Sequence, residues 1–123
     1  MVLVDTSVWI RFLSNREPYA SKLDRLLERD DVAGHEMIYG ALLVGDVGGR
    51  AKMLSAYAQM AQADTIPHTE VVEFVRMHRL HGRGVGWIDL HLLAAAIVGS
   101  HRLWTIDSRF AALAVEMGVA HMG

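Results

Sequence analysis

The chain has 123 residues, of which 52% are hydrophobic and 21% charged, and this size and composition favour one globular domain spanning residues 1–123. Twelve lysines and arginines against fourteen aspartates and glutamates give a formal net charge of −2, so nucleic-acid contact requires a local basic patch. The absence of cysteine excludes disulfides and thiolate metal sites. The apolar runs are too short to span a bilayer and no signal-peptide pattern is present, so we expect a cytoplasmic protein with no membrane partner.

The first half of the chain predicts short buried strands that alternate with helices. In order, we expect a strand at residues 2–4, a helix capped by Thr6 or Ser7 and running to Leu13, a helix starting at Pro18, a very short strand at Val32–Ala33, and a helix from Glu36 to about Val44. The segment GDVGG that follows is typical of a loop.

The second half continues the same alternation. We expect a helix around residues 54–61, a brief strand at 65–67, a helix around 71–78, a glycine-rich loop at 81–86, a helix opened by Asp89 that buries Ile97, a strand at 103–106, a helix at 110–117 and a last strand at 119–120. Such alternation predicts the α/β class, with a mainly parallel sheet of four or five short strands covered on both faces.

Four acidic residues follow or open elements where a strand is expected to lead into a helix: Asp5, Glu36, Asp89 and Asp107. Ligand sites in open α/β sheets form outside the carboxyl ends of the strands, so these carboxylates are expected to converge. A cluster of carboxylates requires a cation to offset its repulsion, and oxygen ligands suit Mg²⁺ or Mn²⁺. Each acid alone also has a plain structural interpretation as a helix cap or a first-turn residue.

Hydroxyl groups stand beside two of these acids, from Thr6 and Ser7 near the first and from Thr105 and Ser108 near the last. They either orient the carboxylates around a metal or cap helices. His35 begins a segment HEMIY that lacks the second histidine of a zinc HExxH helix, and we expect His35 in a loop or at the surface.

A basic stretch provides the other candidate contacts with RNA. It contains Arg76, His78, Arg79, His81 and Arg83, with Arg102 and Arg109 as comparable candidates near the last strand. These side chains either form a solvated face or contact phosphates near the cleft. Trp87, in the glycine-rich loop, is the aromatic residue that we single out for RNA contact, although tryptophan more often belongs to a core or an interface.

The chain resembles the PIN-domain family, and in particular the VapC-type ribonuclease toxins of bacterial toxin–antitoxin pairs. The resemblance covers nearly the whole chain and rests on Asp5-Thr6-Ser7 after the first strand, Glu36 opening a helix, and the segments GWIDLHLLAAAIV and LWTIDSRF. It implies a three-layer α/β/α sandwich and an endoribonuclease that depends on Mg²⁺ or Mn²⁺. By this similarity Asp5, Glu36, Asp89 and Asp107 form the acidic metal site, with Asp107 either a direct ligand or bound through water and Thr105 at a supporting hydroxyl position.

The resemblance also implies a mechanism and partners. Asp5 and Asp89 would hold the first metal, and Glu36 would bind metal or orient and deprotonate a water that attacks the phosphorus. The products would carry 5′-phosphate and 3′-hydroxyl ends. The implied partners are an RNA substrate, a second copy in a homodimer, and a small antitoxin that covers the cleft, with DNA contacted only through that antitoxin.

Other functions were compared with the same residues. A metal-dependent adhesion site needs DxSxS, but Trp9 occupies the second serine position, and a DxDxT phosphatase fails because Ser7 replaces the second aspartate. A phosphoryl-receiver domain needs paired acids after the first strand and a late lysine, and the chain has neither. A phosphate-binding GxxxxGK[ST] loop is absent. The remaining alternative is a catalytically weak PIN-like module that only binds RNA or a partner.

Overall fold

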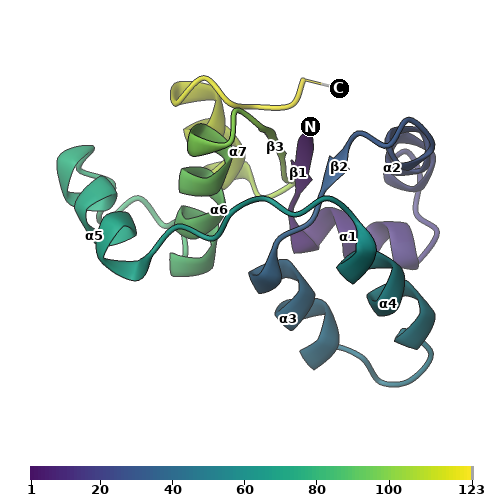
Figure 1. Cartoon of the computed structure of the whole chain (residues 1–123). Helices are drawn as coiled ribbons and strands as arrows, with labels where there is room; N and C mark the ends of the chain where they lie inside the picture. The colour runs from purple at the N-terminus through teal and green to yellow at the C-terminus, as the bar shows by residue number, and fades with distance from the viewer. Residues whose placement is uncertain (123) are drawn as a thin grey trace.

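The computed structural model describes residues 1–122, in which three strands and seven helices alternate along the chain (Figure 1). In chain order they are β1 (Val2–Val4), α1 (Thr6–Leu13), α2 (Tyr19–Glu28), β2 (Val32–Ala33), α3 (Glu36–Val44), α4 (Ala51–Gln59), α5 (His68–Met77), α6 (Trp87–Val98), β3 (Arg102–Trp104) and α7 (Ser108–Glu116). The expected helices are all present, with ends that differ by a few residues. The α/β class is therefore confirmed.

The three strands form one parallel sheet in the order β2-β1-β3. Val2 pairs with Val32 on one side and with Arg102 on the other, so the strands start and end at nearly the same level. Because all three run in the same direction, their carboxyl ends form a single edge of the sheet. This edge leads into α1, α3 and the segment before α7.

The expected number of four or five strands is too high for residues 1–122. The strand expected at 65–67 is absent, and the nearest pairing is a single parallel bridge of Gly34 with Gln62. The strand expected at 119–120 is reduced to a single parallel bridge of Leu103 with Ala120. The second bridge consists of two backbone hydrogen bonds, from Leu103 N to Val119 O at 2.7 Å and from His121 N to Leu103 O at 2.9 Å. Neither segment stays paired for a second residue, so neither forms a strand.

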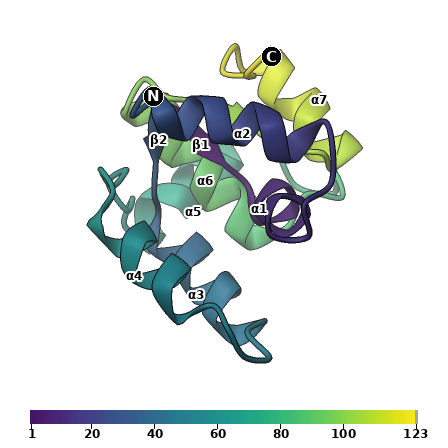
Figure 2. The same cartoon turned by 90° about the vertical axis from the view of Figure 1, so that its right-hand side faces the viewer.

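Helices cover both faces of the sheet. Figure 1 shows the sheet between α6 and α2, and Figure 2 shows α2 lying across the sheet in front of it. In both views α3 and α4 form a hairpin that extends from the carboxyl edge away from the rest of the molecule. The sheet is thus the middle layer, and its carboxyl edge faces the start of α3.

Helix α6 is the central helix, because seven consecutive residues from Leu90 to Ala96 are buried. A helix that is apolar all round is expected inside a domain. Its last turn is more open than the sequence predicted: Ile97 is 36% exposed, because no described element covers that end of the helix as fully as its middle. The helices described in residues 1–122 are too short or too polar to cross a lipid bilayer.

Candidate metal centre

Asp5 is held at the carboxyl end of β1 by both neighbouring elements. Its backbone N–H donates to the carbonyl of Trp104 at 2.8 Å, which extends the pairing of β1 with β3. Its side chain is only 8% exposed and accepts hydrogen bonds of 2.8 Å from the backbone N–H of Thr6 and the hydroxyls of Ser7 and Thr105. Asp5 is therefore the N-cap of α1. The prediction of Thr6 or Ser7 as the cap was wrong, because both already belong to the helix and the carboxylate of Asp5 accepts from the backbone N–H of Thr6.

Thr105 links two of the acids. Its hydroxyl donates to Oδ2 of Asp5 at 2.8 Å. The hydroxyl oxygen of Thr105 in turn accepts from the backbone N–H of Asp107 at 3.1 Å. The hydroxyl of Ser7 lies 3.5 Å away and also accepts from the backbone N–H of Ile106 at 3.4 Å. Ser7 and Thr105 thus join β1, α1 and the segment after β3 into one polar network, whereas Thr6 contributes through its backbone N–H.

Asp107 is the N-cap of α7 and lies at the exposed side of this network. One of its carboxylate oxygens, Oδ1, accepts from the backbone N–H of Phe110 at 2.9 Å. That bond leaves Oδ2 available for another partner. The capping role expected for this residue and a role at a metal are therefore compatible.

Asp89 is the third residue of α6 and completes a group of three carboxylates. Its Oδ2 accepts from the backbone N–H of Gly86 at 3.4 Å. Its pKa is raised from 3.8 to about 6, first because burial disfavours the charged form and then because the carboxylates of Asp5 and Asp107 repel it. The structure therefore brings Asp5, Asp89 and Asp107 close enough to interact, although they are far apart in sequence.

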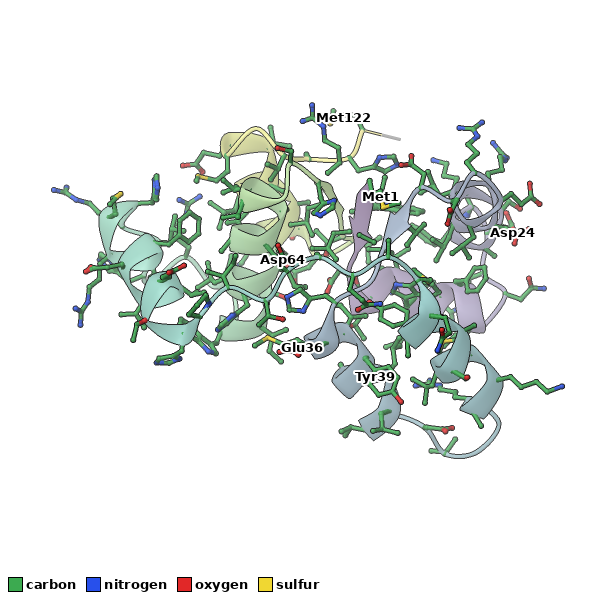
Figure 3. The ribbon with its side chains drawn as sticks, in the orientation of Figure 1. Met1, Asp24, Glu36, Tyr39, Asp64 and Met122 are labelled. Atoms are coloured by element: carbon green, nitrogen blue, oxygen red, sulfur yellow. The ribbon has the colours of Figure 1, made fainter. Side chains whose placement is uncertain are left out.

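Glu36 occupies a different position at the same edge of the sheet. It is the exposed first residue of α3, and Figure 3 places it between the start of that helix and the lower end of α6. Its charge raises the pKa of the neighbouring His35, against the larger effect of burial. No contact described for residues 1–122 joins Glu36 to the three aspartates.

The donor set fits a hard divalent cation by its chemistry. No three His, Asp or Glu side chains within residues 1–122 already stand in a ligating arrangement. The three aspartates nevertheless offer carboxylate oxygens, the ligands that Mg²⁺ and Mn²⁺ prefer, and the pKa of Asp89 is raised by burial and then by the charges of Asp5 and Asp107. A bound cation would offset this repulsion by its positive charge.

His35 lies in the loop between β2 and α3, one of the two places expected for it, but it is buried, so the alternative of a surface position was wrong. Its side chain has no exposed surface, and its Nδ1 accepts from the backbone N–H of Met37 at 3.1 Å, which makes His35 the N-cap of α3. Its backbone N–H donates to the hydroxyl of Tyr57 at 2.8 Å. Burial lowers the pKa of His35, and the imidazole is therefore neutral near pH 7. Tyr57, which the sequence suggested only as a helix residue, thus holds the backbone of His35 directly before Glu36.

The basic residues singled out from the sequence lie on several elements. Arg83 forms an exposed ion pair with Glu116 at 2.6 Å, whereas Arg76 and Arg79 are exposed on and after α5. Arg102 donates to the carbonyl of Gly118 at 2.8 Å, and the side chain of Arg109 lies against Gly84 in the loop before α6. A further cation, on α1, was not singled out from the sequence. Arg11 donates to the carbonyl of Ser7 at 3.2 Å, and only its position one helical turn after Ser7 could have indicated this.

The comparison with protein families agrees with this architecture. Residues 2–116 match the family model described as PIN domain, so the chain belongs to the PIN-domain family. The chain is also 40% identical over 121 residues to proteins named Ribonuclease VapC32 from two strains of Mycobacterium tuberculosis, CDC 1551 / Oshkosh and ATCC 25618 / H37Rv. The alignment covers 98% of this chain and 95% of each relative. The resemblance found in the sequence is therefore confirmed.

Proposed function

We propose that this chain is a divalent-metal-dependent endoribonuclease and the toxin of a toxin–antitoxin pair. The observation that carries the proposal is the group formed by Asp5, Asp89 and Asp107 at the carboxyl edge of a parallel sheet. The likeness to Ribonuclease VapC32 over nearly the full length of both chains supports RNA as the substrate.

In the proposed site, Asp5 and Asp89 hold the cation and Asp107 joins them directly or through water. Asp5 is suited to this because three hydrogen bonds fix its carboxylate, so that it loses little conformational entropy when it ligates. Asp89 is suited because its charge is unfavourable until a cation offsets the neighbouring charges. When bound, the cation supplies acidification of water and stabilisation of charge on a phosphodiester.

Glu36 has the separate role of orienting the attacking water and accepting its proton. Its exposure at the start of α3, apart from the three aspartates, supports this role over that of a buried ligand. Ser7 and Thr105 are positioning residues, because their hydroxyls donate to the carboxylate of Asp5 and fix its orientation. In-line attack on the phosphorus then leaves 5′-phosphate and 3′-hydroxyl ends.

The cation is proposed to be Mg²⁺, with Mn²⁺ as a substitute. The group contains oxygen ligands only, and both His35 and His91 are buried with lowered pKa values outside it. Oxygen donors without imidazole or thiolate favour hard cations over zinc. Titration of activity with each metal after treatment with EDTA distinguishes the two ions.

The proposed protein partners are a small antitoxin and a second copy of the chain, in the cytoplasm. The α3–α4 hairpin supports a protein partner, because Leu43 is 50% exposed, Val44 87% and Val47 fully exposed at the end of α3 and in the loop after it. Light scattering after size-exclusion chromatography, with and without the product of the neighbouring gene, measures both associations. A strictly monomeric chain without such a partner gene would contradict the toxin assignment and leave nuclease chemistry untouched.

Cleavage of RNA by the purified protein tests the central proposal. We expect cleavage with Mg²⁺ or Mn²⁺, none with EDTA, and losses of at least about 100-fold in Asp5→Asn and Asp89→Asn, as is usual for groups that stabilise a transition state. Asp24→Asn is the matched control, because Asp24 is an exposed aspartate on α2 far from the edge (Figure 3). Binding of RNA without cleavage under every metal condition would favour the alternative, a PIN-like binding module.

A further inference from the structure

Trp87 presents a large aromatic surface two residues before Asp89 in the sequence. It is the first residue of α6, so it belongs to the helix and not to the preceding loop as expected from the sequence. Its side chain is 40% exposed, whereas Trp9 is 2% exposed and Trp104 is partly buried. With aromatic side chains of up to roughly 250 Å², this exposure leaves about 100 Å² of indole surface open. An open aromatic surface of this size can stack on a nucleobase.

Two imidazole rings hold the indole in place. His91, one helical turn later, contacts it edge-on with ring centroids 4.7 Å apart and planes at 89°. His68, at the start of α5, contacts it at 5.2 Å and 62°. His91 itself is only 3% exposed, so the indole rests against a ring that cannot move freely. A side chain that is already ordered loses little entropy when a ligand binds, which favours binding.

The position of Trp87 relative to Asp89 defines which part of an RNA it can reach. Residues two apart in an α-helix have Cα atoms roughly 5–6 Å apart and point to different sides of the helix. Asp89 interacts with Asp5 and Asp107, whereas Trp87 faces His68 of the neighbouring helix α5. A base stacked on Trp87 therefore belongs to a nucleotide that flanks the phosphate at the carboxylates.

We propose that Trp87, supported by His68 and His91, is a stacking subsite for an unpaired base adjacent to the phosphate that is cut. The proposal rests on the proposed ribonuclease function and deepens it, because it assigns a binding surface to one base of the substrate. A base in a duplex is stacked on its neighbours and cannot cover the indole. The subsite adds binding energy and leaves the chemical step to the carboxylates.

Binding measurements test the subsite without cleavage. The probes are a fluorescent oligoadenylate and an abasic oligoribonucleotide of the same length, with Mg²⁺ and the Asp5→Asn background to prevent turnover. We expect oligoadenylate to bind about 10-fold more tightly than the abasic strand, a typical gain from one base stacked on an aromatic ring. Trp87→Leu removes this difference and Trp87→Tyr restores most of it. Ile88→Ala is the control, because Ile88 is the adjacent residue and is 47% exposed.

Two further readouts keep the subsite and the ribonuclease function separable. Oligoadenylate should quench tryptophan emission in the protein with Trp87 and leave the emission of Trp87→Tyr unchanged. This measurement applies even if Trp87→Leu does not fold. In cleavage assays, Trp87→Leu should raise KM for single-stranded RNA about 10-fold with kcat within twofold, since stacking stabilises ground and transition states equally.

Specific results overturn the subsite. Equal weakening of both probes by Trp87→Leu, or no weakening and no quenching, would show that the indole contacts no base. Weakened binding of an antitoxin segment with unchanged RNA binding would assign the indole to a protein partner instead. A protein that cuts no RNA with any metal refutes the proposed function. The subsite is tested separately, because tighter binding of oligoadenylate than of the abasic strand supports it and equal binding refutes it.

Discussion

Replacing Asp89 by asparagine should make the metal-free protein more stable at neutral pH while it removes activity. The carboxylate is charged at neutral pH although burial and the charges of Asp5 and Asp107 oppose ionisation. Asparagine keeps an oxygen that can accept the hydrogen bond from Gly86 N and carries no charge. The substitution therefore removes the repulsion of Asp89 by Asp5 and Asp107, which is present in the native protein when no cation is bound.

The magnitude follows from the pKa of Asp89, which rises from 3.8 to about 6 on folding. At 1.36 kcal/mol per pKa unit this corresponds to about 3 kcal/mol, and solvent screening of a partly exposed group reduces it to about 1–2 kcal/mol. Because the folded pKa is raised, the folded state binds the proton more tightly than the unfolded state. The contribution of this protonation to the free energy of unfolding is fully present below pH 3.8. It is lost as the pH rises through about 6.

Urea unfolding followed by circular dichroism in EDTA measures this effect. Asp89→Asn should raise the free energy of unfolding by about 1–2 kcal/mol at neutral pH, and the gain should shrink toward about pH 4, where the native carboxyl is protonated. Mg²⁺ should stabilise the native protein more than the variant. Asp24→Asn, which removes a charge far from the site, controls for net charge. A gain of equal size at both pH values, or a loss at neutral pH, would refute the reasoning.

Three further substitutions probe the framework around the site. Thr105→Val removes the hydroxyl that donates to Asp5, so it should lower the free energy of unfolding by about 1–2 kcal/mol and slow cleavage; unchanged urea unfolding and kcat would contradict this. Tyr57→Phe leaves the buried N–H of His35 without its acceptor and should cost about 1–3 kcal/mol in the same assay; an unchanged free energy of unfolding would contradict this. Arg83→Ala breaks only an exposed ion pair and should leave the thermal midpoint unchanged, so a clear drop would show that the pair is structural.

The approach of the three aspartates could be predicted from the sequence because it depends on topology. Asp5 and Thr105 each follow a buried apolar run, and parallel strands bring their carboxyl ends to one edge. Asp107 caps α7 after β3 as expected. Asp89 lies in the first turn of α6, but this helix follows the loop after α5, so the expectation that a strand leads into it was wrong. Whether these acids ligate a cation, and whether Glu36 acts with them, stays a prediction.

The errors arose where the outcome depends on packing rather than on pattern. His35 is polar and next to a charged residue, which favours a surface position, yet it is buried, with its backbone N–H donating to Tyr57 and its Nδ1 accepting from the backbone N–H of Met37. Trp87 was assigned to a loop because glycines precede it, although the helix starts at that residue. The two outer strands were overpredicted because β-branched residues indicate extended backbone without indicating how many residues pair.

The network around Asp5 separates the acids into fixed and adjustable members. Asp5 receives hydrogen bonds from α1 and from Thr105, so its position is set by the pairing of β1 with β3 before any cation binds. Asp89 has a single weak bond of 3.4 Å, and Asp107 keeps one oxygen free, so both can move toward a cation. A rigid first ligand with adjustable companions explains how residues without a preformed ligating arrangement can still form a selective site, because folding fixes one ligand and the cation orders the others.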